Sequence, residues 1–407
     1  MSFSVKKIRR DFPMIAKGFE GSPLVYLDNG ATTLKPKAVI EALSDYYCSY
    51  SANVHRALHG PAKKATSEYE KTRSLVQSRI NASSSDEIIL TSGTTAGLNL
   101  LAHSYGSLLG PEDEILLTVS DHHSNIVPWQ LLRERKGVVL KVIPVSDRGE
   151  LEMPALTSLL SKKTKLVVLP HVSNTLGTIN PVGEIVSLVK KNSKALVIVD
   201  GAQGIPHLRV DVRDLGVDFY VFSSHKVFGP TGLGVLYGKK ELLERMPPFL
   251  GGGDMVDQVD FAETTYAPIP YKFEAGTPHI AGSIGLGAAI RYLESLDFEG
   301  VMAHEEELTI CGLELLKGIS GLHLLGEASQ RVPLFTFVIE GAHAQDLGMI
   351  LGQKGLAVRT GHHCTWPLLK RFGADSTTRA SLAMYNTVEE IEQLAKGIRE
   401  ALKILAV

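Results

Sequence analysis

Short apolar runs recur between residues 88 and 237, and several of them are unbroken stretches of valine, isoleucine and leucine. A strand with one face in solvent alternates apolar and polar residues, whereas a strand covered on both faces is apolar throughout. Helix-like segments such as residues 182–191 separate the runs, which is typical of strands joined by crossover helices. The sequence therefore predicts an α/β fold with a mainly parallel seven-stranded sheet. The predicted strands are residues 88–90, 115–119, 138–145, 165–169, 195–199, 219–222 and 234–237.

The pattern changes after a turn-rich segment near residue 250, which is followed by a long stretch predicted to be irregular. Helices and strands then alternate in a different order to the C-terminus, as in an α+β unit. We expect a large domain over residues 21–289 and a smaller α+β domain over residues 290–407. Residues 1–20 are predicted to form a short amphipathic helix, with Ile8 and Phe12 on one side, that packs on the smaller domain.

The composition narrows the class of protein. The chain is 44% hydrophobic and 21% charged, with a net charge of −2, so neither a nucleic acid nor a membrane surface is indicated as a partner. The three cysteines are widely spaced, which argues against a disulfide framework and against a metal cluster. We expect a cytoplasmic protein, because free thiols persist in a reducing compartment.

A lysine and an aspartate at the ends of successive predicted strands point to one cofactor. Lys226 follows the run 219–222 after two serines and a histidine. A lysine at the mouth of a buried strand loses hydration, which lowers the pKa of its amine and suits it to Schiff-base chemistry. Asp200 ends the strand 195–199, where a buried carboxylate requires a cationic partner such as a protonated pyridine nitrogen. An amine for an aldehyde and an anion for a ring nitrogen are what pyridoxal phosphate requires.

Further polar residues follow the predicted strands at the same edge of the sheet, where ligands of open parallel sheets bind. Thr94 and Thr95 open a helix whose N-terminal N–H groups favour a phosphate. Ser223 and His225 are further candidates to hold that phosphate. His123, one of two adjacent histidines in a loop, is the candidate to stack on the cofactor ring and move protons.

A second reactive stretch lies in the predicted smaller domain. Cys364 comes directly after His362 and His363, and Arg359 precedes them. A thiol beside imidazoles and a guanidinium is readily held as thiolate, the nucleophilic form. Zinc bound by His362, His363 and Cys364 is a rival interpretation, but three consecutive ligands do not converge easily on one tetrahedron, so we expect no metal.

Three other residues are candidates to hold the carboxylate of a substrate. Asn174 follows the strand 165–169 and can both donate and accept hydrogen bonds. Arg359 begins the cysteine loop, residues 359–367, and Arg379 lies on the predicted strand that follows this loop. A guanidinium binds a carboxylate through two parallel N–H groups, so either arginine suits this role.

These stretches together resemble the cysteine desulfurases, which are fold-type I pyridoxal-phosphate enzymes of the class V aminotransferase family. The resemblance runs over essentially the whole chain and is strongest with the group II enzymes, the SufS/CsdA type, which carry Arg-x-Gly-His-His-Cys. The stretches that match are residues 53–56, 122–129, 200–203, 217–226, 273–278, 359–364 and 379–381.

The resemblance implies a function and a role for each matching residue. Lys226 would hold the cofactor covalently, Asp200 would pair with its ring nitrogen and Gln203 with its ring hydroxyl. Cys364 would take the sulfur of L-cysteine as a persulfide and leave L-alanine. The sulfur would then pass to a small acceptor of the SufE or SufU type, on the way to iron–sulfur clusters.

The resemblance also implies a homodimer. Thr277 would reach the cofactor phosphate across the dimer interface. His55 and Arg56 would belong to the substrate entrance of the partner subunit. The chain departs from the family pattern at Leu250 and at the pair Thr365-Trp366, which bears on loop dynamics and partner recognition rather than on the reaction.

Three alternative functions remain open at this point. A selenocysteine lyase would use the same residues on L-selenocysteine. An aminotransferase or epimerase of the same fold would leave Cys364 without a role. A non-catalytic sulfur carrier or scaffold belongs to a different class of protein, and it would not bind pyridoxal phosphate.

Overall fold

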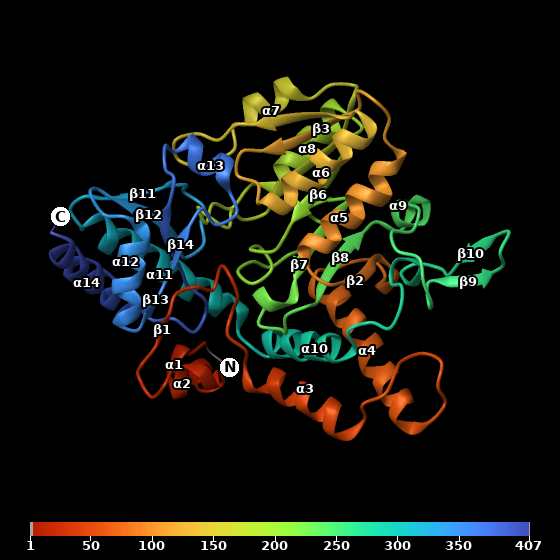
Figure 1. Ribbon diagram of the computed structural model, residues 1–407, viewed down its shortest axis with the longest axis horizontal. Helices are drawn as coiled ribbons and strands as arrows, with labels where there is room; N and C mark the ends of the chain where they lie inside the picture. The colour runs from red at the N-terminus through yellow and green to blue at the C-terminus, as the bar shows by residue number, and fades with distance from the viewer. Residues whose placement is uncertain (1–2, 407) are drawn as a thin grey trace.

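The computed structural model describes residues 3–406, and a seven-stranded sheet forms the centre of its larger unit (Figure 1). All neighbouring strands are parallel except at β8, which runs antiparallel to both β2 and β7. The predicted fold class, a mainly parallel α/β sheet of fold-type I, is confirmed. In spatial order the strands are β2 (Ile88–Thr91), β8 (Gly234–Gly238), β7 (Phe219–Ser223), β6 (Leu196–Asp200), β5 (Thr164–Pro170), β3 (Glu114–Thr118) and β4 (Val139–Ile143).

The two faces of this sheet pack into separate apolar cores. On β5, Val167 and Leu169 enter one core, whereas Leu166 and Val168 enter the other. Both faces are therefore covered, which is why the strand sequences do not alternate with polar residues. The helices of this unit are α3 (Lys37–Ser49), α4 (Gly60–Arg79), α5 (Thr94–Ser104), α6 (His123–Lys136), α7 (Met153–Leu159), α8 (Val182–Asn192), α9 (Lys240–Arg245) and α10 (Ile280–Glu294).

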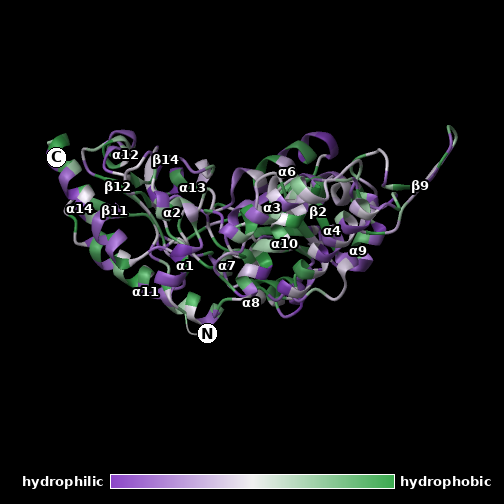
Figure 2. Cartoon of the chain, turned by 90° about the horizontal axis from the view of Figure 1, so that it is seen from below, coloured by the Kyte–Doolittle hydropathy of each residue, from purple (hydrophilic) through white to green (hydrophobic). Residues whose placement is uncertain are grey.

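A smaller unit lies beside the larger one, as Figure 2 shows from below. Its four-stranded antiparallel sheet has the order β11-β12-β15-β14, and it has its own core, to which Val25 and Leu27 also belong. The division of the chain into two domains at residue 290 stays a prediction. The elements of the smaller unit are β1 (Val25–Tyr26), α11 (Phe298–Lys317), β11 (Leu322–Leu324), β12 (Leu334–Ile339), α12 (Ala344–Gln353), β13 (Leu356–Ala357), β14 (Arg359–Gly361), α13 (Trp366–Arg371), β15 (Thr377–Ser381) and α14 (Val388–Leu405).

The N-terminal segment differs from the prediction of a single helix. It forms α1 (Val5–Arg10) and α2 (Pro13–Lys17), because Pro13 lacks an N–H group and begins a new helix at its first turn. The side chains of Ile8 and Phe12 are both buried, as the amphipathic pattern predicts. Among residues 3–406, none of the helices combines the length and apolar character that a membrane crossing requires.

The stretch predicted to be irregular contains a β-hairpin. Strands β9 (Val256–Val259) and β10 (Thr264–Tyr266) pair in antiparallel fashion and extend away from the body of the molecule (Figures 1 and 2). Val259, Phe261 and Tyr266 are exposed along it. The hairpin lacks the half-buried alternation by which a strand is recognised in sequence, so the prediction of irregular structure here is wrong.

The topology fixes where polar side chains gather. Because β8 is antiparallel to both β2 and β7, the carboxyl ends of β2, β7, β6, β5 and β3 all lie at one edge of the sheet. The loop between β14 and α13 of the smaller unit reaches this edge, where the N–H of His123 donates to the carbonyl oxygen of Cys364 at 2.8 Å. The two units therefore meet over the strand ends.

Candidate active site

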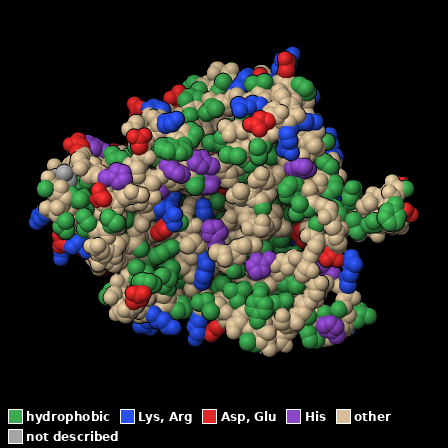
Figure 3. Space-filling model, viewed as in Figure 1, with side chains coloured by type: hydrophobic (Ala, Val, Ile, Leu, Met, Phe, Trp, Pro, Cys, Tyr) green, Lys and Arg blue, Asp and Glu red, His purple; other side chains and the backbone are tan. Residues whose placement is uncertain are grey.

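A cavity of about 270 Å³ lies at this edge and is lined by residues from both units. On the face seen in Figure 3, histidine and basic side chains gather where the units meet. A small-molecule site is typically such a concave cavity with a few convergent polar groups. The predicted site residues that line the cavity are Thr94, Thr95, Asn174, Asp200, Gln203, Ser223, His225, Lys226, Arg359, Cys364 and Arg379.

Lys226 ends a single helical turn that follows β7. Burial lowers the pKa of its amine to about 8, although the nearby carboxylate of Asp200 acts in the opposite direction. A lysine with an ordinary pKa would be almost wholly protonated near neutral pH, whereas a pKa of about 8 leaves about a tenth of the amine free at pH 7. The position therefore suits a lysine that attacks an aldehyde.

This lowered pKa leads to a pH prediction for the apoenzyme. The deprotonated amine is the nucleophile, so the rate of covalent capture of pyridoxal phosphate should rise with pH and level off above about 8. The measurement is the appearance of the cofactor's visible absorbance after mixing, over a series of pH values. A rate that keeps rising towards the ordinary lysine pKa of about 10.4 would contradict the buried setting of Lys226.

Asp200 ends β6 inside the cavity and is fully enclosed. Its carboxylate accepts hydrogen bonds from the N–H of Ala202 at 2.9 Å and from the side-chain amide of Asn125 at 3.3 Å. Burial raises the pKa of Asp200, which means that its charged form lacks a sufficient partner in the chain itself. The protonated ring nitrogen of pyridoxal phosphate would supply that positive charge, so Asp200 fits the cofactor.

Asn125 and Asp121, for which the sequence suggested no role, are linked to Asp200 by hydrogen bonds. The amide of Asn125 donates to Asp121 at 3.2 Å as well as to Asp200, and it therefore bridges two buried carboxyl groups. Burial raises the pKa of Asp121 well above its ordinary value. Asp121 precedes the N-cap of α6 and Asn125 lies in its first turn, so their contact depends on how the chain enters the helix.

The N-terminus of α5 also lines the cavity, through Thr94 and Thr95. The hydroxyl of Ser223 accepts from the N–H of Thr94 at 2.8 Å and lies 2.7 Å from its hydroxyl. Gly93 precedes the helix with a φ of 145°, and a side chain on Gly234 would come within 2.5 Å of its Cα, so both positions require glycine. Helix N–H groups and paired hydroxyls at one point fit the phosphate of the cofactor.

The structure places His122, and not His123, on the cavity wall, which favours His122 over the predicted His123 as the residue that covers the cofactor ring. His122 caps α6, and its Nδ1 accepts from the N–H of Ser124 at 3.1 Å. His123 is the first residue of the helix, whereas His122 has an extended backbone, so the two side chains point in different directions. Its ring contacts the cysteine loop instead, where Nε2 accepts from the N–H of Trp366 at 3.1 Å.

The cysteine loop has an unusual backbone that several contacts hold in place. His363 and Cys364 have φ values of 49° and 58°, a left-handed conformation that side chains disfavour. The side-chain amide of Asn174 donates to the carbonyl oxygen of His363 at 2.8 Å, and the N–H of His123 donates to that of Cys364. Thr365, at one of the departures from the family pattern, is buried and lies 2.7 Å from the hydroxyl of Thr175. The larger unit thus fixes the loop that carries the thiol.

Two arginines face each other across β14 and β15, at positions where like charges repel unless an anion lies between them. Asp28 provides that anion, and Arg359 binds it through two nitrogens at 2.7–3.2 Å. Arg379 is buried and donates to the carbonyl oxygen of Asn174 at 2.8 Å. Its Nε is buried without a hydrogen-bond partner among residues 3–406, and both arginines line the cavity as candidates to bind a substrate carboxylate.

Three predicted site residues lie away from this cavity. His55, Arg56 and Thr277 are exposed, and His55 and Arg56 pair with Glu70 at 2.9 Å and Asp254 at 3.0 Å, respectively. Within one chain they do not contribute to the site. Gln203 does line the cavity, and its side-chain amide donates to the carbonyl oxygen of Gly30 at 2.6 Å.

Comparisons with known proteins agree with this geometry. The family model "Aminotransferase class-V" matches residues 25–394. A cysteine desulfurase of Synechococcus elongatus is 47% identical over 400 residues, which are 98% of this chain and 64% of that protein. A cysteine desulfurase of Serratia proteamaculans is 46% identical over 407 residues, 100% of both chains. The crystal structure of the cysteine desulfurase CsdA from Escherichia coli has a TM-score of 0.93 and 36% identity, over 99% of this chain and 100% of that one.

The fold, the lysine and aspartate that line the cavity, and the family match define a pyridoxal-phosphate enzyme of the class V aminotransferase family, to which this chain belongs. Within that family the chain is a cysteine desulfurase, as its full-length relatives show. The predicted family and cofactor are therefore confirmed.

Proposed function

We propose that this chain removes the sulfur atom of L-cysteine, leaves L-alanine and a persulfide on Cys364, and passes the sulfur to a SufE- or SufU-like acceptor for iron–sulfur cluster assembly. The observation that carries the proposal is that the thiol of Cys364 and the amine of Lys226 line one cavity, although they come from different units. Relatives named as cysteine desulfurases support the substrate. A cytoplasmic location remains a prediction from the sequence.

Different residues of the cavity would bind different parts of the cofactor. Pyridoxal phosphate, when bound, supplies an electron sink for the pair left at the substrate Cα after loss of its proton. Asp200 would keep the ring nitrogen protonated, and Lys226 would take the Cα proton as general base. His122 would cover the ring face. Thr94, Thr95, Ser223 and His225 would hold the phosphate, and Gln203 would bind the ring hydroxyl.

Sulfur transfer needs no external oxidant. Cys364, as thiolate, attacks the sulfur of the substrate that Arg379 and Asn174 orient by its carboxylate. A new S–S bond forms while the Cβ–S bond breaks, and the electron pair of the broken bond stays with the substrate carbon. Protonation of that carbon gives alanine, and the transferred sulfur remains as a persulfide on Cys364.

We further propose a homodimer in which the exposed residues outside the cavity complete the partner's site. Thr277 would reach the phosphate of the partner subunit, and His55 and Arg56 would border its substrate entrance. Their exposure and their distance from the cavity of their own chain support this arrangement.

The assignment of His122 to the cofactor ring is testable with a matched pair of variants. His122→Ala should weaken binding of pyridoxal phosphate by about tenfold, because a stacking contact of about 1 kcal/mol and its buried area are lost. His123→Ala should leave that affinity unchanged, because its ring lies on the cysteine loop. Titration of the two apoenzymes with pyridoxal phosphate measures both affinities. If His123→Ala weakened binding and His122→Ala did not, His123 would be the residue that covers the ring.

The proposed sulfur transfer predicts a dependence on a persulfide acceptor. With L-cysteine alone, alanine should appear in a single burst and then stop, because the persulfide on Cys364 blocks the next cycle. A thiol reductant or a SufE- or SufU-like protein should restore steady turnover. The time course of alanine formation distinguishes a single burst from steady turnover. Steady turnover without reductant or acceptor would contradict the persulfide mechanism.

A further inference from the structure

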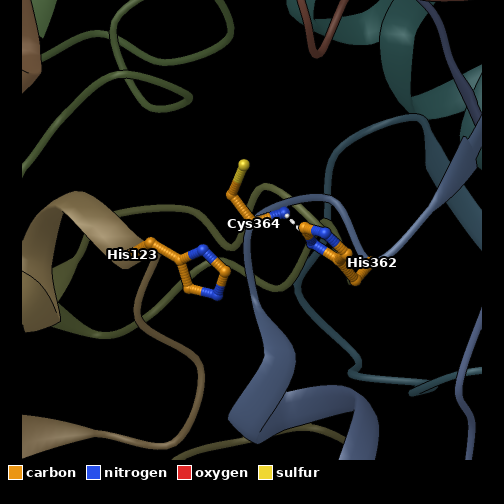
Figure 4. Close-up of side chains that lie close together, drawn as sticks. All are labelled: His123, His362 and Cys364. Carbon is orange, nitrogen blue, oxygen red and sulfur yellow. Dashed lines mark hydrogen bonds between the residues drawn. The ribbon is translucent and has the colours of Figure 1, made fainter.

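A cluster of two imidazoles and a thiol lies at the rim of the cavity. The structure brings His123, from the start of α6, beside His362 and Cys364 of the loop that follows β14, and in Figure 4 the backbone of Cys364 lies between the two rings while its sulfur points away from them. One side-chain ligand atom of each residue lies within 4.8 Å of the others. The sequence suggested His363 as the second imidazole, but that ring is buried against Thr377 at 2.8 Å. The cluster therefore takes His123 from the larger unit in place of His363, so its three residues are no longer consecutive in the chain.

The donor set is one that zinc prefers. Zinc binds thiolate sulfur at about 2.3 Å and imidazole nitrogen at about 2.0–2.1 Å in a tetrahedron, so its ligand atoms lie about 3.3–3.6 Å apart. A contraction of about 1 Å from the present separations would reach that geometry. Three protein ligands leave a fourth position for water or for a substrate sulfur.

The surroundings of the two rings keep them close to the thiol. The indole ring of Trp366 stacks on His362 with a centroid distance of 5.2 Å and an interplanar angle of 17°. His123 Nε2 accepts from the N–H of Trp366, and His362 Nδ1 accepts from the N–H of Cys364, both at 3.1 Å. A metal would take one lone pair from each ring in exchange for these hydrogen bonds. Because the Trp366 bond lies at an exposed position, water can replace it.

We propose that His123, His362 and Cys364 form a zinc-binding site that holds the thiol in an inactive state. On binding, the S–H bond of Cys364 breaks, its proton goes to solvent and a Zn–S bond forms. Zinc keeps its +2 charge throughout, so no electrons are transferred. The bound thiolate has its nucleophilic lone pair committed to the metal, and it cannot attack a substrate sulfur. This inhibitory consequence rests on the proposed function, whereas the binding itself does not.

The first test needs no mutation. Zinc is added to the cofactor-loaded enzyme, the thiols are alkylated for a short time, and mass spectrometry of the peptides compares Cys364 with Cys48. Cys48 is an exposed free thiol in the same molecule and serves as the internal control. We expect zinc to slow alkylation of Cys364 by at least about tenfold relative to Cys48, and a chelator to reverse the effect. Equal alkylation of Cys364 with and without zinc would overturn the proposal.

The second test identifies the ligands by direct metal binding. Cobalt(II) replaces zinc as the probe, because a tetrahedral thiolate site gives intense d–d absorption in the red part of the spectrum. Cys364→Ser, His123→Ala and His362→Ala should each lower the affinity by at least about tenfold, whereas Cys48→Ala and His323→Ala, at exposed positions, should not. The visible absorbance of the bound cofactor reports that each variant is folded. Unchanged affinity in the three ligand variants would overturn the site.

The two hypotheses fail in different ways. If zinc protects Cys364 and the ligand variants lose the metal, the site is established. If zinc then left cysteine turnover intact, Cys364 would not be the sulfur acceptor, and the proposed function would fail while the binding site stood. If turnover of L-cysteine depends on Cys364, but zinc neither protects Cys364 from alkylation nor inhibits turnover, the zinc proposal fails and the proposed function stands.

Discussion

Replacing Lys226 with alanine should lower the turnover of L-cysteine by about 10⁴-fold or more and remove the visible absorbance of the covalently held cofactor. The effect is large because one amine has two tasks, the covalent attachment of pyridoxal phosphate and the transfer of the Cα proton. Its burial and its lowered pKa, about 8, suit both tasks. Absorbance spectra and alanine formation, measured on the same preparations, give the two quantities.

Lys35 offers a matched control for this experiment. Burial also lowers the pKa of Lys35 to about 8, but its amine bonds to the carbonyl oxygen of His225 at 2.9 Å and does not line the cavity. Lys35→Ala should therefore keep the visible absorbance of the cofactor. If Lys226→Ala retained that absorbance or normal turnover, another residue would have to hold the cofactor.

Replacing Cys364 with alanine should keep the cofactor absorbance and lower the turnover of L-cysteine by at least about 10³-fold. The thiol lies at the mouth of the cavity on a loop that contacts the larger unit, so its loss leaves the binding of the cofactor intact. L-selenocysteine should be affected less, because selenium is the better leaving atom. Parallel assays on both substrates separate a cysteine desulfurase from a selenocysteine lyase.

The other two thiols are the controls for Cys364. Cys48 is exposed on α3 and Cys311 lies on α11, both away from the cavity. Cys48→Ala and Cys311→Ala should retain normal turnover of L-cysteine. Desulfuration at the normal rate by Cys364→Ala would show that Cys364 is not the nucleophile.

The parts of the fold that depend on local pattern were predictable. Unbroken apolar runs identify the strands, and a parallel sheet then brings the residues at their carboxyl ends together, which is why Asp200 and Lys226 could be paired before any coordinates. Polar neighbours identified Cys364 as reactive. The structure brings all three into one cavity.

The parts that depend on long-range packing were not predictable. Which of two adjacent histidines faces the cavity depends on where α6 begins, so His122 was missed. Asp28 lies between the two arginines because β1 pairs with β13, a contact between segments far apart in the chain. Trp366, a departure from the family pattern, proves to stack on His362, which its sequence position could not show.

The central claim is that the sulfur of L-cysteine passes to Cys364 above the cofactor site. The most direct test is mass spectrometry of the peptides after brief incubation of the enzyme with L-cysteine and without reductant. We expect a gain of one sulfur atom on the peptide that carries Cys364, and unmodified peptides for Cys48 and Cys311. Sulfur on either of those two cysteines instead, or alanine formed while Cys364 stays unmodified, would contradict it.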